Sequence, residues 1–137
     1  MICLDTNAVI PVLNETESRV GARLRATLKN RRRPVAISSV VLLELWHGAI
    51  KSARPERNAK RIEEFLTAPI QVLPFDADDA REAGDIRAVL ERTGKPIGPY
   101  DLLIAAQARR RGATLITANE REFARVPGLK TADWAAA

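Results

Sequence analysis

Cysteine and histidine are almost absent from this sequence, with one of each among its 137 residues. Cys3 has no second cysteine to pair with, so no intrachain disulfide can form, which suits a reducing compartment. His47 is the single histidine, which excludes a nuclease that uses two histidines as its acid and base. A structural zinc site needs more ligands of these two kinds than the chain contains.

Long apolar runs are missing as well. No stretch approaches the ~20 residues needed to cross a bilayer. The start of the chain has neither the basic region nor the apolar length of a signal peptide. Two nucleotide-binding loops are also absent, since neither GxxxxGK[ST] nor a GxGxxG after a strand occurs. We therefore expect a cytoplasmic protein without membrane association, folded as a single domain over residues 1–137.

Positive charge is in excess, because 22 Lys and Arg residues stand against 17 Asp and Glu, for a net charge of +5. Most of the basic residues are arginine, whose planar fork pairs with phosphate, so a nucleic-acid or acidic partner is one explanation. A codon-driven preference for arginine over lysine explains the composition equally well. Composition alone leaves the two explanations open.

Short apolar segments alternate with longer periodic ones along the chain. The short segments are bounded by Pro, Gly or Ser and are typical of buried strands, whereas the longer ones carry apolar residues at helical spacing. We expect strands at residues 1–5, 35–38, 70–75 and 113–117, with a further edge strand at 129–134. We expect helices at 17–33, 40–51, 55–68, 76–94, 100–112 and 120–124, and either a short helix or a turn at 8–14. This alternation predicts an α/β fold, with a central parallel sheet of four to five strands flanked by helices on both faces.

Polar residues stand at the expected ends of two strands. Asp5 directly follows three apolar residues, and Thr117 closes the segment 113–117. The carboxyl ends of parallel strands form the crevice in which such folds bind ligands. A buried carboxylate needs a partner or a cation, so Asp5 is a candidate functional residue. Thr6 is either a turn residue or a group that orients Asp5 or a water, and Asn7 is best explained as a turn residue.

For three more polar residues, a functional role competes with a purely structural one. Glu44 interrupts an otherwise apolar helix, which favours an inward or half-buried carboxylate over one at the helix boundary that reaches solvent. Asp101 opens an apolar helix after "GPY", a position that the helix dipole explains as well as a functional role does. Asn119 is either a helix N-cap paired with Glu122 or an amide oxygen that faces the crevice.

Asp5, Glu44 and Asp101 come from distant segments, but each is expected at the same end of one sheet. Three like charges in one cleft repel each other unless a cation lies among them. Hard oxygen ligands without Cys or His suit Mg²⁺ or Mn²⁺. A basic chain with an acidic pocket predicts phosphodiester hydrolysis, in which a metal activates water and stabilises the leaving oxygen.

Four segments give the chain a resemblance to a known family: "LDTN", "SSVVLLELWHGA", "GKPIGPYDLLIAAQA" and "ATLITANEREFARVPGL". In their order and spacing they resemble the PIN-domain ribonucleases, most of all the toxin of VapBC-type toxin–antitoxin pairs, over nearly the whole chain. The resemblance implies an α/β/α sandwich and an endoribonuclease that depends on Mg²⁺ or Mn²⁺. It also implies a homodimer neutralised by a small VapB-type antitoxin, whose tail covers the active groove. Operator DNA would be bound only through that antitoxin.

The resemblance also assigns roles to particular residues. It implies a catalytic and metal-binding set of Asp5, Glu44, Asp101 and Asn119. Asn119 departs from the family, which has an acid at the fourth position, so a second metal would be held more weakly. Thr6 and Thr117 would support the site by holding a water or a phosphate, and hydrolysis would leave a 5′-phosphate and a 3′-hydroxyl.

Three arginines are candidates for binding the RNA substrate. Arg121 and Arg125 lie on a short helix expected near the cleft. Arg87 shares a helical stripe with apolar residues, which would point it toward the acids, although a solvated or snorkelling arginine explains the pattern slightly better. The runs Arg31–Arg33 and Arg109–Arg111 close helices, where basic residues are favoured anyway.

Other functional classes fit the sequence less well. A phosphatase with a DxD signature needs a second carboxylate where Asn7 stands, and a receiver domain needs a lysine on a late strand, which the stretch between Lys95 and Lys130 lacks. A catalytically weak or inactive protein that acts mainly as the partner of an antitoxin or repressor stays open because of Asn119. Buried like charges argue against it, and metal-dependent RNA cleavage separates the two hypotheses.

Overall fold

The computed structural model describes residues 1–14 and 17–136. Its strands are β1 (Ile2–Leu4), β2 (Val35–Ser38), β3 (Ile70–Leu73), β4 (Thr114–Ile116) and β5 (Lys130–Ala132). Its helices are α1 (Thr6–Leu13), α2 (Arg19–Asn30), α3 (Ser39–Lys51), α4 (Pro55–Phe65), α5 (Ala77–Arg92), α6 (Pro99–Arg110) and α7 (Glu120–Phe123).

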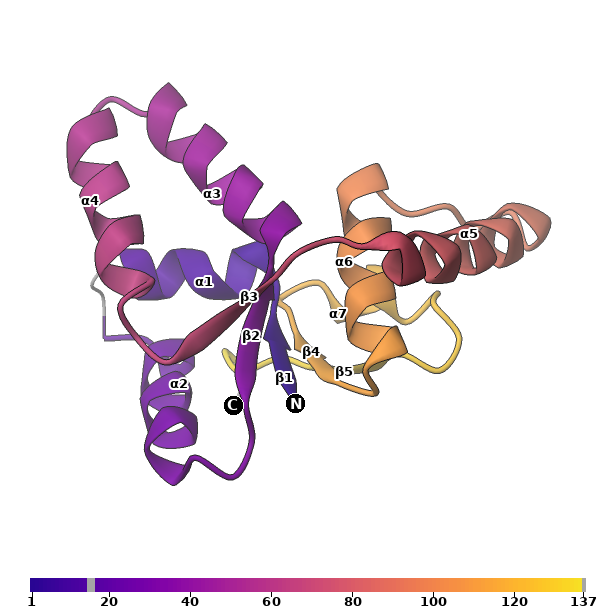
Figure 1. The fold of residues 1–137 in the computed structure, drawn as a ribbon, viewed down its shortest axis with the longest axis horizontal. Coiled ribbons are helices and arrows are strands. Elements are labelled where there is room, and N and C mark those ends of the chain that lie inside the picture. The colour runs from indigo at the N-terminus through magenta and orange to yellow at the C-terminus, as the bar shows by residue number, and fades with distance from the viewer. Residues whose placement is uncertain (15–16, 137) are drawn as a thin grey trace.

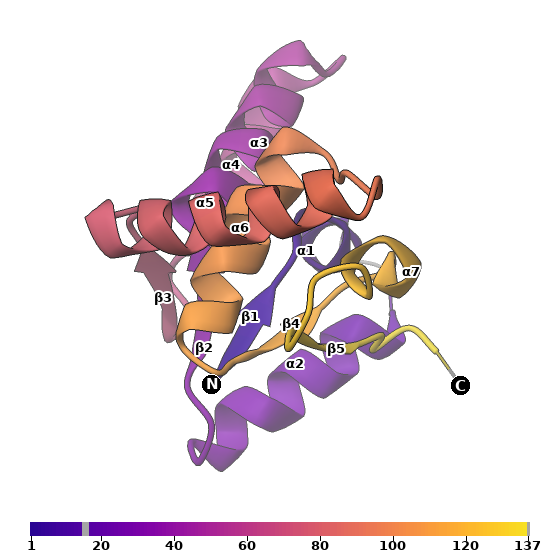
Figure 2. The same cartoon turned by 90° about the vertical axis from the view of Figure 1, so that its right-hand side faces the viewer.

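The five strands of the described chain form one sheet in the order β3-β2-β1-β4-β5, and every neighbouring pair is parallel. β1 is the central strand, and all three of its side chains are buried, as expected of a strand covered on both faces. Helices α5 and α6 lie on one side of the sheet and α2 on the other (Figure 2). The predicted α/β/α arrangement is therefore confirmed.

The carboxyl ends of the three middle strands meet at one edge of the sheet. Leu4 at the end of β1 is in register with Ile37 on one side and with Ile116 on the other. The next residues, Asp5, Ser38 and Thr117, are all buried at this edge. Helices α3 and α4 form a pair that projects beyond it (Figure 1).

Most of the expected elements are present, with shifted ends. The segment expected as either a short helix or a turn is the helix α1, which begins earlier than expected because Asp5 is its N-cap. The helix expected over 17–33 is shorter, since Arg31 adopts a left-handed conformation (φ 55) that ends α2 before Pro34. Residues 15–16, which separate these two segments, lie outside the described chain.

A buried ion cluster joins α5 to α6. The side chain of Asp79 is fully buried, and its Oδ1 accepts hydrogen bonds from Arg110 Nε at 2.7 Å and Arg111 Nη1 at 2.9 Å. Gln107 Nε2 donates to the other carboxylate oxygen at 3.1 Å. The arginine run that closes α6 therefore does more than complement the helix dipole: it neutralises a buried acid and holds the two helices together.

Candidate active site

Asp5 is the most deeply buried of the four residues predicted to be catalytic, with 4% of its surface exposed. Its two carboxylate oxygens have separate donors: the backbone N–H of Thr6 at 2.9 Å from Oδ1 and the hydroxyl of Thr117 at 2.9 Å from Oδ2. Burial raises the pKa of Asp5, these two donors oppose the rise, and the charges of Glu44 and Glu122 add to it. Two hydrogen bonds thus fix the orientation of the Asp5 carboxylate, although the charges of Glu44 and Glu122 repel it.

Glu44 lies half-buried on α3, as its place in an apolar helix predicts. The hydroxyl of Thr6 donates to its Oε1 at 2.7 Å, so Thr6 contacts both Asp5 and Glu44. Of the two roles that the sequence left open for Thr6, these contacts favour the orienting one, which stays a prediction. Glu44 also lines two hollows, one of about 230 Å³ beside α4 and one of about 740 Å³ that reaches His47 and Tyr100.

Asp101 lies in the first turn of α6, where the carboxyl group of Glu122 is within hydrogen-bonding reach. Burial raises the pKa of Asp101, the contact with Glu122 and its charge add to the rise, and Asp5 and Glu44 contribute further, to a value of about 7. Four carboxyl groups from four separate segments therefore share one electrostatic neighbourhood at the carboxyl edge of the sheet.

Glu122 is the site residue that the sequence interpretation missed. From the sequence, Glu122 is expected only as a capping partner of Asn119. In the structure, Asn119 is the N-cap of α7, yet its side chain makes no capping hydrogen bond to the backbone. Its amide nitrogen instead donates to Glu122 Oε2 at 2.9 Å, and the backbone N–H of Gly98 donates to Oε1 at 3.1 Å. The carboxylate beside Asp101 thus belongs to Glu122, and the exposed Asn119 reaches the site through it.

Asn7 corrects a second expectation. It lies in the first turn of α1 rather than in a loop, and its Oδ1 accepts the backbone N–H of Ala118 at 2.9 Å. The hydroxyl of Thr117 accepts the backbone N–H of Asn119 at 3.0 Å while donating to Asp5. Asn7 and Thr117 therefore join the segment after β1 to the segment after β4.

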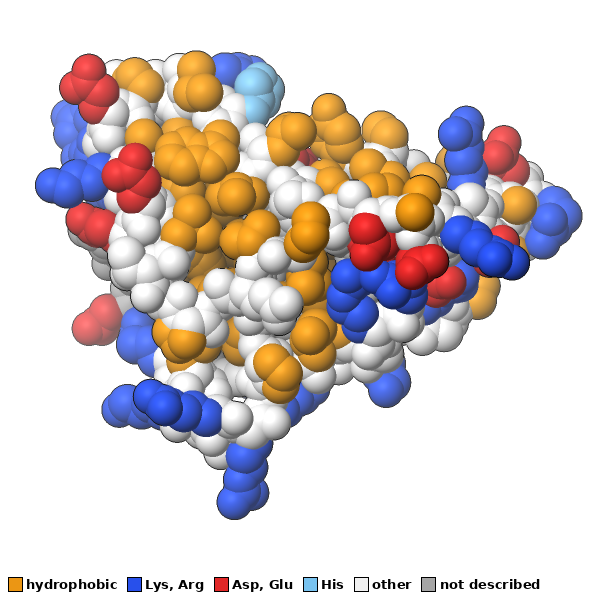
Figure 3. Space-filling view, viewed as in Figure 1, with side chains coloured by type: hydrophobic (Ala, Val, Ile, Leu, Met, Phe, Trp, Pro, Cys, Tyr) orange, Lys and Arg blue, Asp and Glu red, His pale blue; other side chains and the backbone are white. Residues whose placement is uncertain are grey.

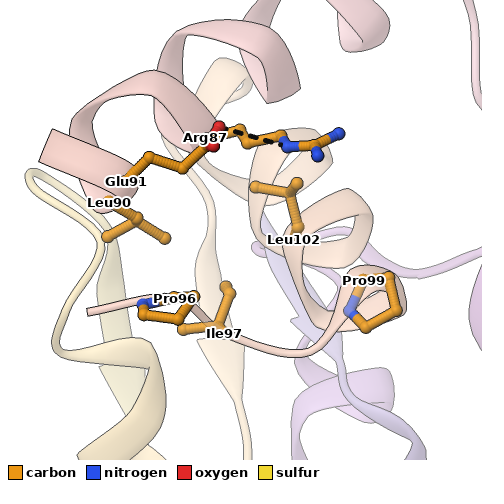
Figure 4. A pocket seen from close by; sticks show the side chains of 7 residues that line it. All are labelled: Arg87, Leu90, Glu91, Pro96, Ile97, Pro99 and Leu102. Atoms are coloured by element: carbon orange, nitrogen blue, oxygen red, sulfur yellow. Dashed lines mark ion pairs between the residues drawn. The ribbon is translucent and has the colours of Figure 1, made fainter. Parts of the chain in front are cut away.

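Arg87 does not point toward the acids, as its helical stripe had suggested. Its side chain is 71% exposed and pairs with Glu91 one turn along α5, at 3.3 Å. Both residues border a cavity of about 300 Å³ between α5, α6 and their connection, whose other walls are mostly apolar (Figure 4). Asp5, Glu44, Asp101 and Glu122 are not among the described residues that line it. The solvated interpretation of Arg87 fits this placement.

The donor set of the site has the chemistry of a hard cation. It offers carboxylate oxygens without a thiolate or an imidazole, which suits Mg²⁺ or Mn²⁺. Burial first, and then repulsion by Glu122, Asp5 and Glu44, raise the pKa of Asp101, and a cation among these groups would relieve that repulsion. Within residues 1–14 and 17–136, however, no three such side chains are already grouped closely enough to hold a metal. The carboxylates would have to draw together around the ion.

The fold and site define a class of α/β proteins with an acidic centre at the carboxyl edge of a five-stranded parallel sheet. The PIN domain matches residues 2–129 of the chain. The tRNA(fMet)-specific endonuclease VapC of Shigella flexneri is 47% identical over 131 residues, which is 96% of each chain. The DNA-bound VapBC structure from Salmonella typhimurium is 40% identical over 97% of both chains, with a TM-score of 0.88. VapBC2 from Rickettsia felis, bound to a DNA fragment from its promoter, is 36% identical over 98% of this chain and 99% of that one, with a TM-score of 0.90.

The chain therefore belongs to the PIN-domain family, and within that family it is of the VapC ribonuclease type. The resemblance carried by the four sequence segments is confirmed.

Proposed function

We propose that the chain is a metal-dependent endoribonuclease and the toxin of a toxin–antitoxin pair. The observation that carries the proposal is the convergence of four carboxyl groups, from Asp5, Glu44, Asp101 and Glu122, at the carboxyl edge of the sheet, where burial and then the neighbouring carboxyl groups raise the pKa of Asp101 to about 7. A protein with only a binding role would gain nothing from such repulsion, whereas a site for a divalent cation requires these groups. The names of the relatives support RNA as the substrate and do not favour the non-catalytic alternative.

Asp5, Glu44, Asp101 and Glu122 would hold the cation, with Asn119 acting on Glu122. A bound Mg²⁺ or Mn²⁺ supplies a Lewis acid and a water of lowered pKa. The protein's own contribution is orientation: Thr117 and the Thr6 N–H hold the carboxylate of Asp5, and the Thr6 hydroxyl holds that of Glu44. Hydrogen bonds that orient ligands typically affect metal affinity or activity about 10- to 100-fold.

The first substrate to test is tRNA(fMet), because the relative from Shigella flexneri is named for it and is 47% identical over almost the whole chain. The structural neighbours are VapBC complexes, which supports a VapB-type antitoxin as the partner here. Operator DNA would then be bound through that antitoxin. A homodimer, a single domain over residues 1–137 and a cytoplasmic location also remain part of the proposal. No helix in the described chain is long and apolar enough to span a membrane.

The test is cleavage of tRNA(fMet) and of total RNA by the purified chain, with Mg²⁺, with Mn²⁺ and with EDTA. Asp5→Asn and Asp101→Asn remove one negative charge each from the centre and should reduce cleavage to background without unfolding the protein. Asp85→Asn is the matched control, because this acid is exposed on α5. Cleavage that survives EDTA, or full activity in both site variants, would refute the proposal.

A further inference from the structure

A basic groove lies beside the acidic centre. Its volume is about 520 Å³, and its walls come from the end of α5, the connection to α6, and α7 with the residues that follow it. The charged residues that line it are Lys95, Arg121 and Arg125, all exposed, and its walls include no acidic residue among those that the structure describes. We call it the Lys95 groove.

The cations of the Lys95 groove are available for a ligand. In the described part of the chain, neither Lys95 nor Arg121 forms an ion pair. Arg125 is held by a neutral contact, in which its Nη1 donates to the backbone carbonyl of Pro96 at 2.8 Å. This contact fixes the guanidinium over the groove without neutralising its charge.

The other basic clusters differ from this one. Arg109, Arg110 and Arg111 are engaged with Glu82, Asp76 and Asp79. Arg33 lies next to Thr114 at the start of β4, which is the opposite edge of the sheet from the acids. Arg87 is paired with Glu91 in the neighbouring cavity. Of the basic clusters in the described chain, the Lys95 groove is the one that gathers three cations without an ion pair next to the centre, whereas Lys51 lines the hollow beside Glu44 as a single cation.

Two hydrogen bonds connect the groove to the acids. The connection that carries Lys95 also carries Gly98, whose N–H holds Glu122, and Pro96, whose carbonyl holds Arg125. Three residues of extended chain span at most about 11 Å, so the Lys95 backbone lies within that distance of Gly98. Arg121 on α7 and Arg125, two residues beyond the end of that helix, both line the groove, while Glu122 on α7 lies beside Asp101.

We propose that the Lys95 groove binds the backbone phosphates of the RNA strand next to the bond that is cut. This inference rests on the proposed function. A polyanion approaching four carboxyl groups is repelled, and three cations beside them offset that repulsion. Among the described residues no aromatic side chain lines the groove, so these walls offer no stacking platform for bases. It therefore binds the strand without reading its sequence, since phosphate contacts position a nucleic acid but do not specify it.

The test measures RNA binding in the Asp5→Asn background, so that the strand is not cut. The groove variant carries Lys95→Gln, Arg121→Gln and Arg125→Gln. The matched control carries Arg23→Gln, Lys29→Gln and Arg32→Gln, which remove three exposed charges on and just after α2. Affinity for fluorescent tRNA(fMet) and for a single-stranded RNA is measured by anisotropy over a range of NaCl concentrations, and thermal unfolding monitors the fold.

We expect the groove variant to bind single-stranded RNA at least tenfold more weakly at physiological salt. Each lost phosphate contact lowers the slope of log K against log[salt] by about 0.7, so three contacts lower it by about 2. The control should keep the slope of the parent. In the active background, the groove variant should raise KM and leave kcat nearly unchanged.

Four results would overturn the inference. Equal slopes in the groove and control variants would show that the groove holds no phosphate. Unchanged RNA binding together with weakened binding of a poly-glutamate peptide would assign the groove to an acidic protein segment. If the wild-type chain cuts RNA and the groove variant cuts and binds it equally well, the groove proposal is refuted and the proposed function stands. If the wild-type chain neither cuts nor binds RNA, the proposed function and the groove proposal both fail.

Discussion

The side-chain amide of Asn119 donates a hydrogen bond to Oε2 of Glu122 across 2.9 Å, one turn along the short helix α7. Glu122 receives its second donor from the backbone of Gly98, which comes just before the helix that carries Asp101. A neutral residue at position 119 is therefore compatible with a site of four acids, because the fourth carboxylate is supplied three residues later.

This relationship predicts unequal effects at the two positions. Glu122→Gln removes a charge from the centre and should lower cleavage at least about 100-fold, whereas Asn119→Ala removes one orienting donor and should cost about tenfold. Single-turnover cleavage with varied Mn²⁺ measures both, and the Asn119 defect should shrink as the metal concentration rises. Glu120→Gln is the control, since Glu120 accepts from Thr131 instead. Equal activities of the Glu120 and Glu122 variants would contradict the prediction.

Thr117 offers a test that keeps the shape of the side chain. Thr117→Val removes the hydroxyl that donates to Asp5 at 2.9 Å and accepts from Asn119, whereas Thr117→Ser keeps it. We expect the valine variant to lose about 10- to 100-fold in activity and the serine variant to stay close to wild type. Cleavage rates and thermal unfolding of both proteins provide the measurement. If valine and serine act alike, the hydroxyl has no orienting role.

We predict that any side chain at position 98 lowers the activity. A Cβ at this position would lie 3.1 Å from Oδ2 of Asp101, closer than ordinary packing allows. Gly98→Ala should displace that carboxylate slightly and lower the cleavage rate about tenfold, because small misplacements at a reacting centre are costly. In Gly84→Ala the new Cβ meets nothing within 4 Å. That control should keep its activity and gain up to about 1 kcal/mol of stability from helix propensity. A fully active Gly98→Ala protein would argue against the position assigned to Asp101.

The sequence alone predicts the sheet and three of the four acids of the candidate site, Asp5, Glu44 and Asp101, for reasons that lie mostly in local patterns. Short apolar runs identify the buried strands, and a carboxylate within or directly after apolar residues identifies Asp5 and Glu44. Glu122 escapes this logic, because a four-residue helix is too short to show a periodicity and its acid looks like an ordinary capping residue. Asn7 was misassigned for a related reason: its partner, Ala118, is 111 residues away in the chain.

The buried cluster around Asp79 is also invisible to local patterns, since "DADD" and "RRR" each look like favourable helix ends. In the structure, burial works to raise the pKa of Asp79, but hydrogen bonds from Arg111 and Arg110, with further ones from Asp76 and Gln107, outweigh it. The pKa is therefore lowered from 3.8 to about 2.

This lowered pKa predicts how stability depends on acid. As pH falls below about 4, the unfolded chain protonates Asp79 while the folded protein keeps it ionised, so the unfolded state binds more protons. The free energy of unfolding should be insensitive to this group above about pH 4 and should fall by about 2 kcal/mol between pH 4 and 2.

Urea unfolding of wild type, Asp79→Asn and Asp78→Asn at a series of pH values measures this dependence. Asp79→Asn removes the counter-charge of Arg111 and leaves Arg110 paired with Asp76 alone, and it should cost about 3 kcal/mol at pH 7. It should also lose the part of the acid dependence that Asp79 supplies. The exposed Asp78 should change neither quantity appreciably. Because the cluster joins α5 to α6, and α6 carries Asp101, cleavage by Asp79→Asn should fall together with its folded fraction. A loss of activity in fully folded Asp79→Asn would instead assign the cluster a direct part in shaping the site.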